Sequence, residues 1–285
     1  MNRYIIWLLI HISILCVIYD PLYAQDKEVI AHIKDALIKK GANEDRVGIL
    51  LNDPRVYIEN TVIIKNLFQE LPELELHKKY MDIDPKYIDM GKQYIKDKSK
   101  EFKGIHKDFG VSPQIITAIL IIESQLGHYP EKYNVFRSYL SLAACAHPKF
   151  FESLREEYPA LSDNSAFKRA KTKAIWALGE LYCLIVIAEN LNIDPLEITG
   201  SFAGAIGPAQ FIPSSFITYG IDGNNDGKKD PFNEIDAMAS IANYLKLAGW
   251  KEKASLKKKR RALWCYNHSE IYVNTAMMLC TKLSK

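Results

Sequence analysis

The stretch Gly200-Ser-Phe-Ala-Gly-Ala-Ile-Gly-Pro-Ala-Gln-Phe-Ile-Pro-Ser-Ser215 decides how this chain is interpreted. Gly204 and Gly207 predict a sharp turn, because glycine lets the backbone bend tightly and lets a ligand approach closely. Gln210 follows the turn and offers both a hydrogen-bond donor and an acceptor. A plain loop-to-helix junction explains the glycines and serines, but it does not require this amide between two apolar residues. We therefore expect a turn that faces a ligand.

A second informative segment lies upstream, where the apolar run Ile115–Ile122 ends at Glu123. Ser112-Pro113 is a typical helix start, so we expect a helix from residue 113 to about residue 126. It is apolar nearly all round, which predicts a central, buried helix. Burial without a cationic partner raises the pKa of a carboxyl, and a protonated Glu123 can donate to a leaving-group oxygen. The alternative is a helix-end glutamate that points to solvent.

The rest of the chain is mainly helical in pattern. Apolar spacing and end signals such as Gly41 and Gly249 predict helices over 26–40, 46–51, 87–102, 166–190 and 236–248. Residues 60–68 are rich in β-branched side chains and are ambiguous. Strand signals are few and short, so the expected class is mainly α, with a domain boundary near residue 80.

Composition limits the kinds of protein that this chain can be. Its 285 residues are 48% hydrophobic and 25% charged, which is typical of a globular chain with a sizeable core. The formal net charge of +3 is too weak to predict nucleic-acid binding, although it does not oppose approach to a polyanion.

The N-terminus has the pattern of an export signal. Arg3 is followed by an apolar stretch and then by Leu22-Tyr-Ala24, which supplies the small residue that a signal peptidase needs. We expect residues 1–24 to be a signal peptide cleaved after Ala24. The alternative is an uncleaved anchor, although Asp20-Pro21 cuts the apolar run near the lower limit for a membrane span.

Cysteine usage fits an exported protein. Cleavage would leave four cysteines, Cys145, Cys183, Cys265 and Cys280, and export allows disulfides among them. The sequence does not choose among the three pairings. Cys183 fits equally well as a buried helix residue.

Three segments together carry a family resemblance. They are Glu123-Ser-Gln-Leu-Gly-His-Tyr129, the Gly200–Ser215 stretch, and Asp236-Ala-Met-Ala-Ser-Ile-Ala-Asn-Tyr-Leu245 followed by Gly249-Trp250. In order and spacing they resemble the lytic murein transglycosylases of the B type over roughly residues 80–285. Residues 25–80 resemble the helical N-terminal part of the same family more loosely.

The resemblance implies a lysozyme-like α-helical catalytic domain over 81–285, with a helical N-terminal region over 25–80. It implies cleavage of the MurNAc–GlcNAc β-1,4 bond of peptidoglycan with Glu123 as the sole catalytic acid/base. In that mechanism the substrate's own N-acetyl group assists, and the sugar's 6-hydroxyl closes a 1,6-anhydro ring. Such substrate-assisted enzymes are exceptions to the two-carboxylate rule of glycoside hydrolysis.

The resemblance also implies substrate-binding residues. At positions that match the family pattern these are Ser201, Gln210, Tyr244, Tyr266 and Asn267. The last two stand in Tyr266-Asn-His-Ser269, a polar and aromatic segment of the kind that stacks on sugars. A helix start after a loop explains the same segment equally well.

A calcium-binding loop is expected at Asp222-Gly-Asn-Asn-Asp-Gly-Lys-Lys-Asp230. Its oxygen side chains and its glycine match the first part of an EF-hand loop, but Asn233 stands where the usual glutamate belongs. The family resemblance includes a lengthened EF-hand-like loop, with these ligands: Asp222, Asn224, Asp226, the backbone of Lys228, and Asp236. Such a Ca²⁺ would be structural, with no cofactor required for the chemistry. The alternative is an Asp/Asn/Gly turn without metal.

The basic run between Lys251 and Arg261 has two interpretations. The usual one is a solvated surface segment, and the other is contact with acidic peptides or polymers of the cell wall.

We expect an exported monomer of the bacterial periplasm or cell envelope that acts on peptidoglycan glycan strands. It would bind no nucleic acid and keep no membrane span after signal cleavage. Two other functions remain open: a lysozyme-type muramidase that hydrolyses the same bond on the same fold, and a non-catalytic module that binds cell wall or calcium.

Overall fold

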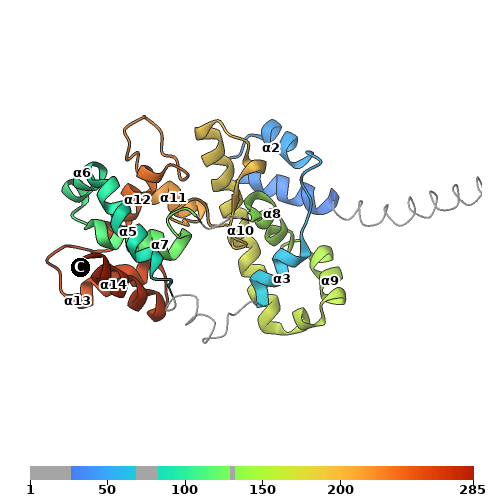
Figure 1. Ribbon diagram of the computed structural model, residues 1–285. Helices are drawn as coiled ribbons and strands as arrows, with labels where there is room; N and C mark the ends of the chain where they lie inside the picture. The colour runs from blue at the N-terminus through green and yellow to red at the C-terminus, as the bar shows by residue number, and fades with distance from the viewer. Residues whose placement is uncertain (1–26, 69–82, 129–131) are drawn as a thin grey trace, which may run out of the picture. The chain divides into compact units, whose positions relative to one another are not determined.

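The computed structural model describes residues 27–68, 83–128 and 132–285 (Figure 1). The expected signal peptide and the expected boundary near residue 80 lie outside the described residues, and both stay predictions. The described part is mainly α-helical, as predicted, with a single two-stranded antiparallel ladder.

Helices account for most of the described residues. An N-terminal helix over 27–39 precedes the following elements: α2 Glu44–Leu51, α3 Asn60–Phe68, α5 Lys86–Asp97, α6 Ser99–Phe109, α7 Pro113–Ser124, β1 Tyr133–Asn134, α8 Val135–Ala144, α9 Pro148–Glu157, the 3-10 helix Pro159–Ser162, α10 Asn164–Leu191, the 3-10 helix Pro195–Glu197, β2 Thr199–Gly200, α11 Pro213–Tyr219, α12 Glu234–Leu247, α13 Leu256–Tyr266 and α14 Glu270–Leu283.

The chain divides into two compact units, each made from two separate stretches. The described part of one unit lies within Met1–Leu67 and Phe136–Tyr182, and the other comprises the described residues of Phe68–Val135 and Cys183–Lys285. In the first unit the ambiguous segment 60–68 is helical, because Val62, Ile63 and Leu67 form a buried stripe. The second unit holds all the residues singled out as a site.

Helix α7 is the central helix of the second unit, as predicted. It packs against α5, α12 and α14, which Figure 1 shows grouped around it, and its apolar side chains from Ile115 to Ile121 are buried. Ser112 has the extended backbone of an N-cap, but its side chain makes no capping hydrogen bond. The helix ends at Ser124, two residues before the predicted end, because Gln125 and Leu126 take left-handed backbone angles.

The single helix predicted over 87–102 is wrong. The structure has two helices, α5 and α6, that meet at Lys98, whose φ of −98° and ψ of 24° leave the helical region. The amphipathic pattern continues across the break because both helices bury one face against the same unit. The spacing of apolar residues predicts which face of a helix is buried, but it does not predict a change of direction between two amphipathic helices.

The short ladder positions the start of the glycine-rich stretch. Tyr133 pairs with Gly200 and Asn134 with Thr199, so residue 200 is held beside the entry to α8. The Asn134 side chain also donates to the Leu196 carbonyl oxygen.

Two features bear on the cell compartment. Helix α10 is long and apolar enough to span a membrane, but half of its most apolar window is buried within the protein, as in a core helix. The four cysteines expected in the exported form are free in the structure, and Cys145 is buried.

Candidate active site

A groove of about 1060 Å³ lies in the second unit, and it brings the predicted chemical residues together. The end of α7, the glycine-rich stretch, α12 and the end of α13 form its walls. Its lining includes every predicted catalytic and substrate-binding residue, namely Glu123, Ser201, Gln210, Tyr244, Tyr266 and Asn267.

Glu123 occupies the last turn of α7 and is partly buried. Its carboxylate oxygen Oε1 accepts a hydrogen bond of 2.8 Å from the hydroxyl of Tyr272, a residue of α14 that is 0% exposed. The carboxyl group therefore has a fixed position at the wall of the groove, between an apolar helix and a buried phenol. The solvent-facing alternative does not describe it, and whether it holds a proton at neutral pH stays a prediction.

The glycine-rich stretch folds back on itself beside Glu123. The Ser201 N–H donates to the Ala205 carbonyl oxygen at 2.9 Å, and the Ile206 N–H donates to the Phe211 carbonyl oxygen at 2.9 Å. Glycine is required at two points here, because a Cβ atom would lie 2.2 Å from the Ala205 oxygen at Gly200 and 2.0 Å from the Pro231 oxygen at Gly207. The predicted turn is thus confirmed: close backbone contacts explain the glycines at positions 200 and 207, and a φ of +88° explains Gly204.

The end of α7 is tied directly to this turn. The Ser124 hydroxyl donates to the Pro208 carbonyl oxygen at 2.8 Å and accepts from Gly127 N–H at 3.0 Å. Ser124 is 5% exposed, so both bonds are shielded from water. They fix the turn relative to the neighbouring carboxylate of Glu123.

Gln210 is held in an unusual backbone conformation. Its φ of +48° lies in the left-handed region, as do those of Gln125 and Leu126, and both glutamines line the groove. A side chain in this region costs about 1–2 kcal/mol, and such strain tends to gather at functional sites. The Gln210 side-chain nitrogen donates to the Gly207 carbonyl at 3.0 Å, which orients the amide in the wall of the groove.

The hydroxyl group of Ser201 closes the turn through its oxygen and keeps its hydrogen available for the groove. Its hydroxyl oxygen accepts from Ala205 N–H at 3.0 Å, which helps to close the turn. The hydroxyl hydrogen is not used by that bond and can be donated into the groove.

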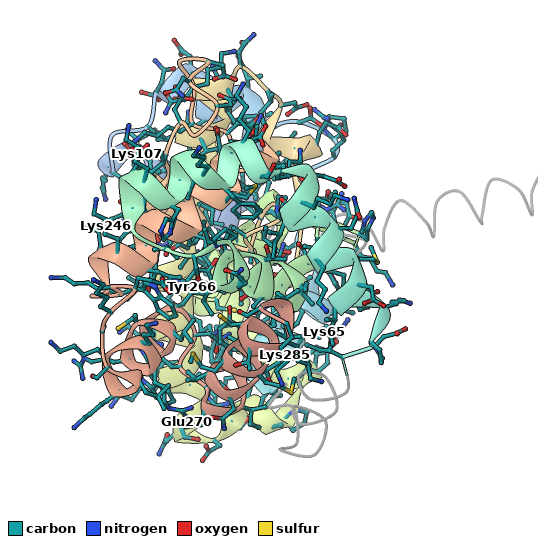
Figure 2. The ribbon with its side chains drawn as sticks, turned by 60° about the vertical axis from the view of Figure 1, so that its left-hand side comes forward. Lys65, Lys107, Lys246, Tyr266, Glu270 and Lys285 are labelled. Atoms are coloured by element: carbon teal, nitrogen blue, oxygen red, sulfur yellow. The ribbon has the colours of Figure 1, made fainter. Side chains whose placement is uncertain are left out.

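Aromatic rings from α12, α13 and the glycine-rich stretch form another part of the groove lining. Tyr244 lies 5.0 Å from Tyr266 and 4.5 Å from Tyr219 between ring centres, and Tyr266 stacks on Tyr272 at 6.3 Å with only 10° between the planes. Tyr266, labelled in Figure 2, donates its hydroxyl to the Ala209 carbonyl at 2.7 Å, and Phe211 packs 5.5 Å from it. This side-by-side packing presents ring surface to the groove.

The same packing keeps these phenols neutral. Burial, with a smaller contribution from the neighbouring Tyr219, raises the pKa of Tyr244 to about 12, and its hydroxyl donates to the Cys265 carbonyl. Burial raises the pKa of Tyr266 well above its ordinary value, and the nearby charges of Glu123 and Tyr244 add to the rise. Both hydroxyls are therefore protonated at neutral pH, and each donates its proton to a backbone carbonyl oxygen.

Several residues that line the groove or lie buried behind it were not predicted from the sequence. Tyr272 carried no local signal, because its role depends on a contact with a residue 149 positions away. Tyr87 and Gln125 both line the groove, and the Tyr87 hydroxyl donates to the Gln125 side chain at 2.5 Å; Tyr133 packs edge-on against Phe202. Phe202 and Phe211 could have been noticed as the aromatic residues within the glycine-rich stretch.

The expected calcium loop forms a compact turn. Asp222 accepts from the backbone N–H groups of Asp226 and Gly227, and Asp236, which is 0% exposed, accepts from those of Gly223 and Asp230. Burial raises the pKa of Asp236, against the effect of these backbone donors, and the charge of Asp222 adds to the rise. Over the described residues, no three His, Cys, Asp or Glu side chains are placed to hold a metal ion.

Comparison with known proteins agrees with this geometry. The sequence profile of the family described as "Transglycosylase SLT domain" matches residues 25–261. The membrane-bound lytic murein transglycosylase B of Escherichia coli (strain K12) is 34% identical over 142 residues, which are 50% of this chain and 33% of that protein. The match therefore spans about a third of the relative's own length.

Solved structures show the same fold. The lytic transglycosylase Slt35 of Escherichia coli, in complex with bulgecin A, superposes with a TM-score of 0.70 at 20% identity over 90% of this chain and 92% of that one. SltB3 of Pseudomonas aeruginosa, in complex with NAG-anhNAM-pentapeptide, superposes with a TM-score of 0.72 at 19% identity over 90% and 79%.

The chain is thus a mainly α-helical protein that shares its fold with solved lytic transglycosylases. The chain belongs to the transglycosylase SLT domain family.

Proposed function

We propose that this protein is a peptidoglycan lytic transglycosylase that cleaves the MurNAc–GlcNAc β-1,4 bond and leaves a 1,6-anhydro-MurNAc end. The observation that carries the proposal is the placement of Glu123 and the Gly200–Ser215 turn in one groove of about 1060 Å³. Family membership supports it, as do the lytic transglycosylases that share the fold. One of them, SltB3, was solved with a NAG-NAM-pentapeptide, which is a fragment of this kind of polymer.

The acidic residues of the groove favour a transglycosylase over a two-carboxylate hydrolase. Among the described residues that line the groove, Asp84 is the other acidic side chain besides Glu123. Asp84 is exposed, its carboxylate lies 3.0 Å from Lys86 Nζ, and hydrogen bonds from Lys86 lower its pKa. An exposed carboxylate neutralised by a lysine is poorly suited to act as a second catalytic group.

In the proposed reaction Glu123 first donates a proton to the glycosidic oxygen, which leaves C1 of the MurNAc unit with the departing sugar. The N-acetyl oxygen of that unit attacks C1 and carries the positive charge. The Glu123 carboxylate then removes the proton of the 6-hydroxyl, whose oxygen bonds to C1 as the N-acetyl oxygen leaves. The net reaction consumes no water, and Glu123 ends protonated again, with a proton that came from the 6-hydroxyl.

The other groove residues would hold the glycan. Gln210 and Asn267 offer amides for N-acetyl groups and hydroxyls, Ser201 offers a hydroxyl hydrogen, and the rings of Tyr244 and Tyr266 offer surfaces for sugar rings. The tight packing of these rings means that the site is formed before substrate arrives, which reduces the entropy lost on binding.

The test compares Glu123→Gln with Asp84→Asn on purified peptidoglycan, with products analysed by mass spectrometry. Glutamine keeps an oxygen that can accept from Tyr272 but provides no acidic proton, so Glu123→Gln should fold normally and lose all lytic activity. Asp84→Asn should retain activity, and the wild type should release anhydro ends.

Each alternative predicts a different result. Reducing ends in the products would support the muramidase, and loss of activity in Asp84→Asn would support a second catalytic carboxylate. If Glu123→Gln retained lytic activity, Glu123 would not be the catalytic acid, and the result would favour the non-catalytic module.

We also propose that the loop at Asp222–Asp236 binds Ca²⁺ as a structural ion. Its donors are oxygen atoms, which Ca²⁺ prefers, and Asp236 is a buried carboxylate close enough to Asp222 for their charges to interact. Relatives support it, because Slt35 of Escherichia coli was solved in complex with calcium. Binding requires the carboxylates to exchange backbone hydrogen bonds for the ion, so the loop must rearrange.

The calcium proposal is tested by thermal unfolding in chelator and in millimolar Ca²⁺. The melting temperature should rise with Ca²⁺ in the wild type and not in Asp222→Asn, since ligand binding to the folded state stabilises it. Equal melting temperatures for the wild type in both conditions would leave the loop a turn without metal.

We infer that the protein acts in the bacterial cell envelope as an exported monomer, because its proposed substrate is found there. The relative in Escherichia coli is named as a membrane-bound enzyme. Fractionation of cells that produce the tagged protein should place it in the periplasm or the membrane, and recovery from the cytoplasm alone would refute this inference.

A further inference from the structure

The most concentrated charge on this protein lies on α13 and the loop before it. Residues 251–261 carry seven Lys or Arg and one Glu, and because the whole chain has a formal net charge of +3, the remaining residues together are net negative. A segment this polarised is a candidate for binding a polyanion. Only the cations that the fold does not already pair are available to such a ligand.

Two of them are occupied within the protein. Arg260 pairs with Glu270 and donates to the Asn274 side chain at 2.8 Å. Lys259 lies 3.9 Å from the Glu252 carboxylate and 5.2 Å above the Trp250 ring. Both side chains hold α13 against its neighbours, and neither is available to a ligand.

Three others face solvent. Lys257, Lys258 and Arg261 are exposed, and the described residues place no carboxylate against them. Lys257 and Arg261 are four residues apart, and Lys258 and Arg261 three, so the three cations share one face of the helix. Figure 2 brings this side of the molecule forward, and nitrogen-tipped side chains project outward from the helices at its lower left.

This face continues to the groove. Trp264, three residues after Arg261, is 37% exposed, and its ring packs edge-on 5.7 Å from that of His268. His268 lines the groove together with Cys265 and Tyr266, which belong to the same helix end. With a rise of 1.5 Å per residue, the nine steps from Lys257 to Tyr266 span only about 13.5 Å.

We propose that Lys257, Lys258 and Arg261 form a binding surface for the carboxylates of the peptide stem of a peptidoglycan strand. The proposal rests on the proposed function, which places the glycan in the adjacent groove. A stem of four or five extended residues reaches about 13–18 Å, so a stem attached to a sugar in the groove can reach all three cations. The charge complementarity is direct, because the stem carries the anionic groups of this polymer.

The test uses the full chain with Lys257→Gln, Lys258→Gln and Arg261→Gln combined. Its matched control replaces three exposed lysines of the other unit, Lys39, Lys40 and Lys171, with glutamine. Both variants lose the same net charge. Binding to intact sacculi and to sacculi stripped of their stems by an amidase is measured by co-sedimentation, and release of anhydro products is measured on both substrates.

The α13 variant should bind intact sacculi about tenfold more weakly than the control, as expected for three exposed charge pairs, and should match it on stripped sacculi. The difference should shrink with added salt. Equal binding of the two variants to intact sacculi, or an equal loss on both substrates, overturns the proposal.

A membrane surface is the competing occupant, because Leu256 beside the cations is 61% exposed. The outcome that favours a membrane is that vesicles of phosphatidylcholine and phosphatidylglycerol bind the control and not the α13 variant, while sacculi bind both equally. The ligand of this surface would then be anionic lipid, and the peptide-stem proposal would be wrong. The binding comparison decides this proposal whether or not products form. An absence of anhydro products from the wild type contradicts the transglycosylase activity alone.

Discussion

Replacing Tyr272 with phenylalanine isolates one hydrogen bond of the proposed catalytic carboxyl. The ring of Tyr272 is fully buried and stacks on Tyr266, and its hydroxyl donates to Glu123 Oε1 at 2.8 Å. Phenylalanine keeps the ring and its packing and removes only the hydroxyl. The variant therefore tests whether α14 positions Glu123 for proton transfer.

The magnitude follows from the nature of the acceptor. A hydrogen bond to a charged group contributes about 1.5–3 kcal/mol, and about 1.4 kcal/mol corresponds to tenfold in rate. Charge develops on the carboxylate as its proton moves to the glycosidic oxygen, so the bond is stronger in the transition state than before it. We therefore expect kcat to fall roughly 10- to 150-fold in Tyr272→Phe, with a much smaller change in KM.

The assay is release of anhydro products from purified glycan strands over a range of pH. The pH at which activity falls on the alkaline side should rise in Tyr272→Phe, because a carboxylate that loses a donated hydrogen bond holds its proton more tightly. The control is Tyr94→Phe, which removes a phenol hydroxyl bonded to Met238 Sδ, away from the groove. A kcat within twofold of wild type and an unmoved pH profile would refute the positioning role.

Three further predictions concern the turn and the aromatic wall. Gly207→Ala should destabilise the fold by more than about 2 kcal/mol, because φ is +65° and the new Cβ would meet the Pro231 oxygen, whereas Gly104→Ala on exposed α6 should be neutral or stabilising; equal melting temperatures would contradict this. Ser124→Ala should lower stability by about 1–3 kcal/mol and reduce kcat, because it leaves the Pro208 carbonyl and Gly127 N–H without partners; an active, equally stable variant would show that the tie is dispensable. The free energy of unfolding should fall as pH rises from the ordinary Tyr pKa of 10.0 to about 12. In this range the buried phenol of Tyr244 keeps its proton in the folded state, whereas in the unfolded chain it is deprotonated. Tyr244→Phe should make this fall in stability shallower in alkaline unfolding curves, and identical slopes would count against the burial effect.

The local chemistry of the chain was enough to predict the site's main components. Steric demands on Gly207 and the apolar pattern of α7 are properties of short segments, so the turn and the central helix followed from the residues alone. Gln210 was identified for the same reason, because an amide after a glycine turn is unusual in a purely structural junction. The structure places Gln210, the end of α7 and part of the glycine-rich stretch in the lining of one groove.

Boundaries and directions were less predictable. The break at Lys98 was missed because both α5 and α6 are amphipathic, and periodicity does not register a change of direction. The end of α7 at Ser124 was missed because left-handed angles at Gln125 and Leu126 cost energy that only surrounding packing can offset.

What the sequence determined by itself is the set of chemical groups: one acid in an apolar helix, an amide beside a glycine turn, and aromatic residues near the C-terminus. Only the tertiary structure decided the partners of these groups. It joined Tyr272 to Glu123 across 149 residues and Ser124 to Pro208 across 84, and it grouped Phe136–Tyr182 with the N-terminal stretch. The physical reason is that an apolar face reports that a helix is buried, whereas the helix that covers it is chosen by the packing of the whole unit.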